Sequence, residues 1–191
     1  MSAIFENSQN FTFSEENQEK IRKIFNKYPE NKKQSGMLPI LDIAQRQNNG
    51  WLSDSALQAV ADIINVPKLS VKSIASFYTM YHLKPVGKNV IEICKTLSCK
   101  LRGIDKIQNA IENHLKTKIG ETSEDLQFTI LPCECLGACV NAPVIKINDD
   151  YYEDLSEQNA IDIIDKIKNG SKPKIGSYKD RVSSEPVSEN K

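Results

Sequence analysis

The cysteines are the residues of this sequence whose types and spacing point most clearly to chemistry. There are five, none before residue 94: Cys94 and Cys99 are separated by four residues, and Cys135 and Cys139 by three, with Cys133 just upstream. The chain begins without the basic start and apolar run of a secretory signal, and clustered cysteines in such a chain favour metal binding or thiol catalysis over disulfides. Two thiolate pairs on adjacent loops can converge on one centre, so this spacing predicts a metal site.

Several kinds of site compete for these cysteines. Four thiolates that bind structural zinc usually form compact pairs, often with two intervening residues, whereas the wider spacing here fits a 2Fe-2S rhomb better. A redox dithiol would use a Cys-x-x-Cys pair, which the chain lacks, and a Rieske centre would need His ligands, but His82 and His114 are not placed beside the cysteines. The spacing therefore favours an iron-sulfur centre, keeps zinc as the alternative, and leaves open whether Cys133 or Cys135 binds.

The composition is that of an ordinary soluble protein with enough apolar residues for a core. Its 25 basic residues balance 25 acidic ones, which argues against nucleic acid as a partner. No stretch approaches the run of about 18 apolar residues that a membrane-spanning helix needs. The N-terminus resembles neither a secretory signal nor an organelle transit peptide. We therefore expect a cytoplasmic protein without direct membrane insertion, bacterial if it belongs to a respiratory system.

Two sequence patterns divide the chain near residue 85. Before it, apolar residues recur at helical spacing and predict four short amphipathic helices that form a bundle. Around residues 84–88 proline and glycine interrupt this pattern, and an order β-α-β-β-β-α follows, which suggests an α/β domain of thioredoxin size. The last residues are rich in Ser, Lys, Pro and Glu and have little to bury. The predicted segments are an N-terminal extension (1–13), a helical bundle (14–85), an α/β domain (86–169) and a flexible tail (170–191).

Several motifs then resemble one family over residues 14–169. The chain looks like the small iron-sulfur subunit of the flavoprotein module of respiratory NADH:quinone oxidoreductase (complex I), from a bacterium. The resemblance implies an α+β fold in which an N-terminal helical bundle precedes a thioredoxin-like 2Fe-2S ferredoxin domain. The motifs that carry it are GWLSD (50–54), ASFYTM (75–80), LKPVGK (83–88), CKTLSCKLRG (94–103), ECLGACVNAPV (134–144) and NDDYYEDL (148–155).

The resemblance also implies a ligand set and a partner. One 2Fe-2S cluster would be bound by Cys94, Cys99, Cys135 and Cys139, with Cys133 outside the ligand pattern. No Gly-rich strand-to-helix turn for a nucleotide is present, so FMN and NADH are expected on the larger flavoprotein subunit and no catalytic residue on this chain. The expected location is the cytoplasmic face of the inner membrane, reached through the complex.

Two alternatives to this assignment stay in view. Related subunits serve NAD-linked hydrogenases and formate dehydrogenases, which would keep the cluster and change the assembly. A zinc-stabilised interaction module without a redox role would instead change the chemistry. Iron and acid-labile sulfide in a brown protein would distinguish the first from the second.

The residues around the second cysteine depart from many relatives. Ser98 stands where many have Pro, and Lys100 stands where many have an aromatic or apolar residue. A reduced cluster gains negative charge, so nearby cations such as Lys95, Lys100 and Arg102 favour it. We therefore expect Lys100→Trp to lower the reduction potential.

Overall fold

The computed structural model describes residues 10–181, which divide into two compact units between Val86 and Gly87. We call them the helical unit (residues 10–86) and the sheet unit (residues 87–181). Among the residues described, none of the helices combines the length and the apolar character needed to cross a membrane.

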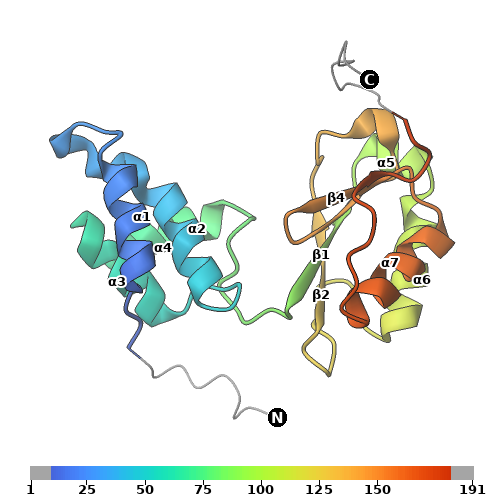
Figure 1. The fold of residues 1–191 in the computed structure, drawn as a ribbon, viewed down its shortest axis with the longest axis horizontal. Coiled ribbons are helices and arrows are strands. Elements are labelled where there is room, and N and C mark those ends of the chain that lie inside the picture. Colours follow the sequence, from blue (N-terminus) through green and yellow to red (C-terminus); the bar gives the residue numbers. More distant parts are fainter. Residues whose placement is uncertain (1–9, 182–191) are drawn as a thin grey trace. The chain divides into compact units, whose positions relative to one another are not determined.

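The helical unit holds the four predicted α-helices and one 3-10 helix that the sequence did not suggest (Figure 1). Two helices begin at serine caps. The Ser14 hydroxyl accepts a hydrogen bond from the Asn17 amide at 3.3 Å, and the Ser53 hydroxyl accepts one from the Ala56 amide at 3.1 Å. The elements are α1 (Glu15–Phe25), η1 (Glu30–Gly36), α2 (Met37–Gln47), α3 (Asp54–Ile64) and α4 (Lys68–Phe77).

The core of the helical unit is formed by the apolar stripes of its helices, and it extends further toward the N-terminus than the sequence predicts. Ile40 and Leu41 of α2 and Val60 of α3 are fully buried in it, and Phe13 is 6% exposed. The Thr12 carbonyl oxygen accepts a hydrogen bond from the Gln47 side chain at 2.8 Å. Residues 11–13 thus pack on the helices rather than forming an extension, and residues 1–9 lie outside the described part.

The sheet unit is built from five strands and the helices between them. Its order, β-α-β-β-β-α followed by a short last strand, contains the predicted sequence of elements. The short helix α5 adds one turn before α6. The elements are β1 (Asn89–Cys94), α5 (Leu97–Leu101), α6 (Ile104–Leu115), β2 (Phe128–Cys133), η2 (Cys139–Asn141), β3 (Ile145–Ile147), β4 (Asp150–Glu153), α7 (Glu157–Lys168) and β5 (Gly176–Ser177).

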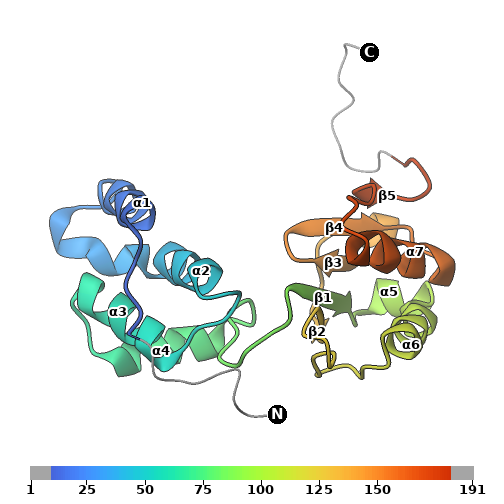
Figure 2. The same cartoon turned by 60° about the horizontal axis from the view of Figure 1, so that its bottom comes forward.

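The five strands form one mixed sheet in the order β2-β1-β3-β4-β5. Strands β1 and β2 are parallel, with Cys94 opposite Cys133 at their carboxyl ends, and β3 and β4 form an antiparallel hairpin. Helices α6 and α7 lie beside each other on one face of the sheet, as both views show (Figures 1 and 2). The parallel pairing therefore brings the ends of two strands, and the loops after them, to the same edge.

The core of this unit lies between the sheet and these two helices. Ile91, Ile93, Ile111, Ile130 and Ile164 are all completely buried there. Gly87, at the entrance of the unit, fits against β2 so closely that a Cβ atom would lie 2.8 Å from the backbone of Phe128. Such a distance excludes any side chain, so the glycine allows β1 to begin alongside β2.

The chain after α7 differs from the predicted flexible tail. Residues 176–177 form β5, which pairs in parallel with β4, and the Tyr178 amide donates to the Glu153 carbonyl oxygen at 3.0 Å. Arg181 forms an ion pair with Asp154. A second ion pair joins Lys174 to Asp180 within the stretch. Backbone pairing and these ion pairs hold it in place, which a composition with few apolar residues does not reveal. The predicted tail residues 182–191 lie outside the described residues.

Candidate metal centre

The first pair of cysteines follows directly from the end of strand β1. Cys94 is the last residue of β1, and Cys99 lies in α5; each is 1% exposed. The Cys94 sulfur lies 3.2 Å from the hydroxyl oxygen of Thr96. These two thiols therefore sit at the edge of the core, in surroundings that exclude most water.

The second pair lies in the connection from β2 to β3 and is exposed to solvent. The sulfur atoms of Cys135 and Cys139 are 3.2 Å apart. The Gly137 amide donates to the Cys135 sulfur at 3.4 Å, and Gly137 has a φ of +84°, a conformation that favours glycine. The loop thus turns both thiols toward a common point.

Contacts across the two loops bring the pairs together. The Leu136 amide of the second loop interacts electrostatically with the Cys94 thiol, and the Thr96 side chain of the first loop interacts with the Cys135 thiol as well as with Cys94. The Ser98 side chain interacts electrostatically with the Cys139 thiol, and the Cys94 thiol interacts with the Cys99 thiol. Together with the contact between Cys135 and Cys139, these interactions link the four thiols across the two loops.

These interactions also shift the pKa values of the thiols. Burial raises the pKa of Cys94, but hydrogen bonds from Thr96 and the Leu136 amide outweigh it, so the net pKa is lowered. The Gly137 amide, followed by the Cys139 thiol, lowers the pKa of Cys135. Burial raises the pKa of Cys99 to about 12. One thiol of each loop is thereby favoured as the thiolate, the form that binds metals.

Cys133 is close to this set but differs from its members. It ends β2, it is half-buried, and burial followed by the Glu92 carboxylate raises its pKa to about 12. Its carbonyl oxygen accepts from the Lys95 amide at 3.0 Å, which fixes its backbone to the end of β1. Its position on a strand, rather than in the loop with Gly137, separates it from Cys135.

The donor set fits a 2Fe-2S cluster. Such a cluster takes four thiolates and accepts hydrogen bonds from backbone amides at its sulfurs, and the loops here offer four thiols together with the Leu136 and Gly137 amides. Across residues 10–181, the His, Cys, Asp and Glu side chains form no group of three or more arranged to hold a single metal ion. The assignment of a binuclear cluster therefore rests on the donor types, their loops and the family described below.

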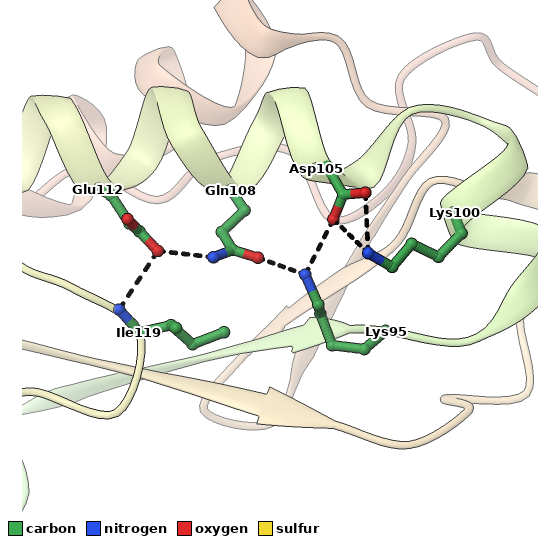
Figure 3. Close-up of polar contacts among 6 residues, drawn as sticks. All are labelled: Lys95, Lys100, Asp105, Gln108, Glu112 and Ile119. Atoms are coloured by element: carbon green, nitrogen blue, oxygen red, sulfur yellow. Dashed lines mark hydrogen bonds and ion pairs between the residues drawn. The ribbon is translucent and has the colours of Figure 1, made fainter.

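Charged residues beside the first pair form a chain of polar contacts (Figure 3). The ammonium group of Lys100 lies 2.8 Å from both oxygens of Asp105, and that of Lys95 lies 3.0 Å from one of them. Lys95 also donates to Gln108, which donates to Glu112 at 2.6 Å. Hydrogen bonds from Lys100 and then Lys95 lower the pKa of Asp105. The cations next to Cys94 and Cys99 are thus partly neutralised.

The sequence predicted the thiols but not their polar partners. The sequence indicates Lys95 and Lys100 as cations near the cluster, but it does not indicate the carboxylate that pairs with them. Asp105 is five residues beyond Lys100, in the first turn of α6, where acidic residues are common. That preference could have predicted an acidic residue near Lys100. The approach of Thr96 to Cys135, in contrast, depends on the folded arrangement of both loops.

Comparison with known proteins also indicates a 2Fe-2S protein. Residues 21–168 match the family described as thioredoxin-like 2Fe-2S ferredoxin. An NADH-quinone oxidoreductase subunit of Rickettsia conorii is 50% identical over 160 residues, which are 84% of this chain and 96% of that protein. The mitochondrial NADH dehydrogenase (ubiquinone) flavoprotein 2 of Dictyostelium discoideum is 45% identical over 175 residues, 92% of this chain and 71% of that one.

A solved structure with a similar fold comes from another assembly. The NAD+-reducing NiFe-hydrogenase in its H2-reduced state contains a region that aligns with 68% of this chain at a TM-score of 0.61 and 19% identity. The aligned part is 22% of that hydrogenase chain. This likeness concerns the fold alone, whereas the family match and the sequence relatives cover most of the chain. The chain belongs to the thioredoxin-like 2Fe-2S ferredoxin family.

Proposed function

We propose that this chain is the electron-transfer subunit that carries one 2Fe-2S cluster beside the FMN-binding, NADH-oxidising subunit of an NADH:quinone oxidoreductase. The observation that carries the proposal is that two thiol pairs lie on neighbouring loops whose side chains interact with one another, in a chain 50% identical to a bacterial NADH-quinone oxidoreductase subunit. The chain would act as part of an oxidoreductase complex without a substrate site of its own.

The four thiolates would be those of Cys94, Cys99, Cys135 and Cys139. When bound, the cluster supplies reversible uptake of one electron at a time. Cys94 and Cys99 would hold it at the buried side of the site, and Cys135 and Cys139 at the exposed side. The Leu136 and Gly137 amides would offset negative charge on the sulfurs. The arrangement suits transfer to a partner, because one side of the site is open to solvent.

The proposed partner is the larger flavoprotein subunit, which would hold FMN and the site of NADH oxidation. Attachment to the cytoplasmic face of the inner membrane would come through the other subunits of the complex. No nucleic acid is expected to bind, since the chain carries equal numbers of acidic and basic residues. Membership of such a complex is supported by the name of the Rickettsia conorii relative, an NADH-quinone oxidoreductase subunit.

The alternative is that the chain belongs to an NAD-linked hydrogenase or formate dehydrogenase and not to a quinone-reducing complex. A similar fold occurs in an NAD+-reducing hydrogenase. Affinity purification of the tagged chain from its own organism, followed by mass spectrometry, distinguishes the two. Recovery of quinone-reducing complex subunits supports the proposal, whereas recovery of a hydrogenase or a formate dehydrogenase supports the alternative.

The chemistry of the site is tested on the chain purified without oxygen. We expect a brown protein with equal amounts of iron and acid-labile sulfide, and an electron paramagnetic resonance signal from one 2Fe-2S centre after reduction with dithionite. A colourless protein that contains zinc would reject the electron-transfer function. The same measurement on a complex with the flavoprotein subunit then tests electron transfer from NADH to the cluster.

A further inference from the structure

The guanidinium group of Arg181 connects the end of the described chain to the segment that carries Cys139. Its Nε atom lies 2.9 Å from the carboxylate of Asp154, and its Nη2 atom contacts the other carboxylate oxygen. The same Nη2 atom donates to the backbone carbonyl oxygen of Val140 at 2.7 Å. Val140 directly follows Cys139 in η2. One side chain therefore binds both an acidic residue and the cysteine-bearing segment.

Asp154 is a fixed anchor for this contact. Its side chain has no exposed surface, and it also accepts a hydrogen bond from the Ser177 hydroxyl at 2.7 Å. A buried carboxylate without a cationic partner is strongly destabilising, so the structure favours an arginine at this point. Arg181 itself is 42% exposed along its side chain, which leaves it accessible to substitution without opening the core.

The segment η2 depends on polar contacts for its position. The Asp154 amide donates to the Asn141 carbonyl oxygen at 2.7 Å, and the Asn141 side chain donates to the Glu153 carboxylate at 2.6 Å. Val140 is 64% exposed, and Cys139 is exposed as well. Apolar burial thus contributes little to holding the first two residues of η2, in contrast to the buried loop of Cys94 and Cys99.

We infer that residues 176–181, which we call the C-terminal strap, hold η2 against the end of β4 through Arg181 and thereby position Cys139 as a cluster ligand. The inference rests on the proposed function only in naming Cys139 a ligand. The strap is itself secured to β4 by the pairing of Glu153 with Ser177 and by the Tyr178 amide. Arg181 is a positioning residue in this account, because it contacts the backbone next to the ligand.

The geometry requires arginine in particular. A guanidinium group presents donors along two edges, so it can satisfy the Asp154 carboxylate and the Val140 carbonyl oxygen together. A lysine ammonium group is a single point charge, and it can neutralise Asp154 without reaching Val140 in the same way. Arg181→Lys therefore separates the two contacts, whereas Arg181→Gln removes the charge as well.

The experiment compares the full-length chain, purified with its cluster, with its Arg181→Gln and Arg181→Lys variants. Hydrogen exchange is measured at the Asn141 and Ala142 amides, which are bonded within η2 and its cap. We expect exchange at least about fivefold faster in both variants, since a hydrogen bond from a charged group is lost. The half-life of the visible absorbance in the presence of an iron chelator should shorten as well. Arg22→Gln is the matched control, because Arg22 forms an exposed pair with Glu19 in the helical unit.

Each outcome decides the inference. Unchanged exchange at these two amides in both variants would overturn it, and so would full rescue by lysine, which would show that Arg181 only neutralises Asp154. If Arg181→Gln accelerates exchange throughout the sheet unit, the loss of charge beside Asp154 has destabilised the whole unit. Exchange at Asn141 and Ala142 in Arg181→Lys, which keeps the charge, then tests the inference. A wild-type chain without a 2Fe-2S signal would reject the proposed function, while exchange at Asn141 and Ala142 would still test the strap.

Discussion

Both carboxylate oxygens of Asp105 lie 2.8 Å from the ammonium nitrogen of Lys100. Lys100 is the neighbour of Cys99, and Lys95, the neighbour of Cys94, contacts the same carboxylate. Two cations and one anion therefore act together beside the buried thiols. The expected effect of Lys100 on the cluster is smaller than that of an unpaired lysine, because Asp105 already offsets part of its charge.

Asp105→Asn should raise the reduction potential of the cluster. The variant leaves two positive charges without their anion, and nearby positive charge favours the reduced form. We expect a shift on the order of 10 to 30 mV for partly exposed groups, and a shift in the opposite direction for Lys100→Trp. A redox titration followed by electron paramagnetic resonance measures both.

Asp165→Asn is the control for this titration. Asp165 lies on α7 and pairs with His114 of α6. It is one turn before Lys168, whose ammonium group lies over the Phe128 ring at the beginning of β2. It thus sits toward the end of the sheet opposite the cysteines. A drop in potential on Asp105→Asn, or an equal shift in the control, would contradict a local effect of Asp105.

Cys135→Ser should abolish the 2Fe-2S signal, whereas Cys133→Ser should retain it. Cys133 is fixed at the end of β2, where the Lys95 amide holds its backbone, and it lacks the loop geometry that brings Cys135 within 3.2 Å of Cys139. Visible absorbance and iron content of the two purified variants provide the measurement. A cluster retained in Cys135→Ser would mean that Cys133 can replace the lost ligand, and its loss in the double variant would prove that replacement.

Gly87→Ala should destabilise the sheet unit by about 1 to 3 kcal/mol. The new Cβ atom would lie 2.8 Å from the backbone of Phe128, so β1 and β2 would have to separate. Urea unfolding followed by a probe in the sheet unit gives the change in free energy. Lys88→Ala, at the exposed next position, should have little effect, and equal losses in the two variants would argue against the steric cause.

The stability of the sheet unit should fall at acidic pH through Glu112. Its pKa is lowered mainly by the hydrogen bond from Gln108 and further by Lys118, against the opposing effect of burial. The unfolded carboxyl titrates near its ordinary value of about 4.3. The contribution of Glu112 is therefore complete above that value and is lost as the pH falls through the lower pKa of the folded state.

Glu112→Gln isolates this contribution. The free energy of unfolding should differ most between wild type and variant at neutral pH, and the difference should shrink below about pH 4. Glu124→Gln, at an exposed position, is the control and should follow the wild-type curve. A difference that grows with acid would contradict the assigned direction.

The sequence predicts this fold and site wherever the signal is local. The four helices follow from apolar residues at helical spacing, the β3–β4 hairpin from two short strands around Asn148–Asp150, and the family ligand set from two cysteine motifs. The contacts that complete the site are long-range: Thr96 reaches Cys135, and Arg181 reaches Asp154 and Val140. No local pattern encodes such pairs, because the partners approach only after the strands have paired.

The same reasoning explains the segment after α7. Residues 171–181 have few apolar side chains, and composition alone suggests a chain that remains unfolded. These residues are held in place instead by backbone hydrogen bonds to β4 and by the ion pair of Arg181 with the buried Asp154 carboxylate. Neither contribution depends on the hydrophobicity of the segment, so neither is visible in its composition.

The close fit of Gly87 against Phe128 also indicates where the sheet unit can be joined to another protein. The boundary between the two units falls immediately before Gly87, and no side chain can be accommodated at position 87 itself. Additional residues inserted between Val86 and Gly87 would lengthen only the connection, whereas those inserted after Gly87 would shift β1 out of register with β2. A ferredoxin module exchanged between relatives should therefore be joined upstream of this glycine and keep it as its first residue.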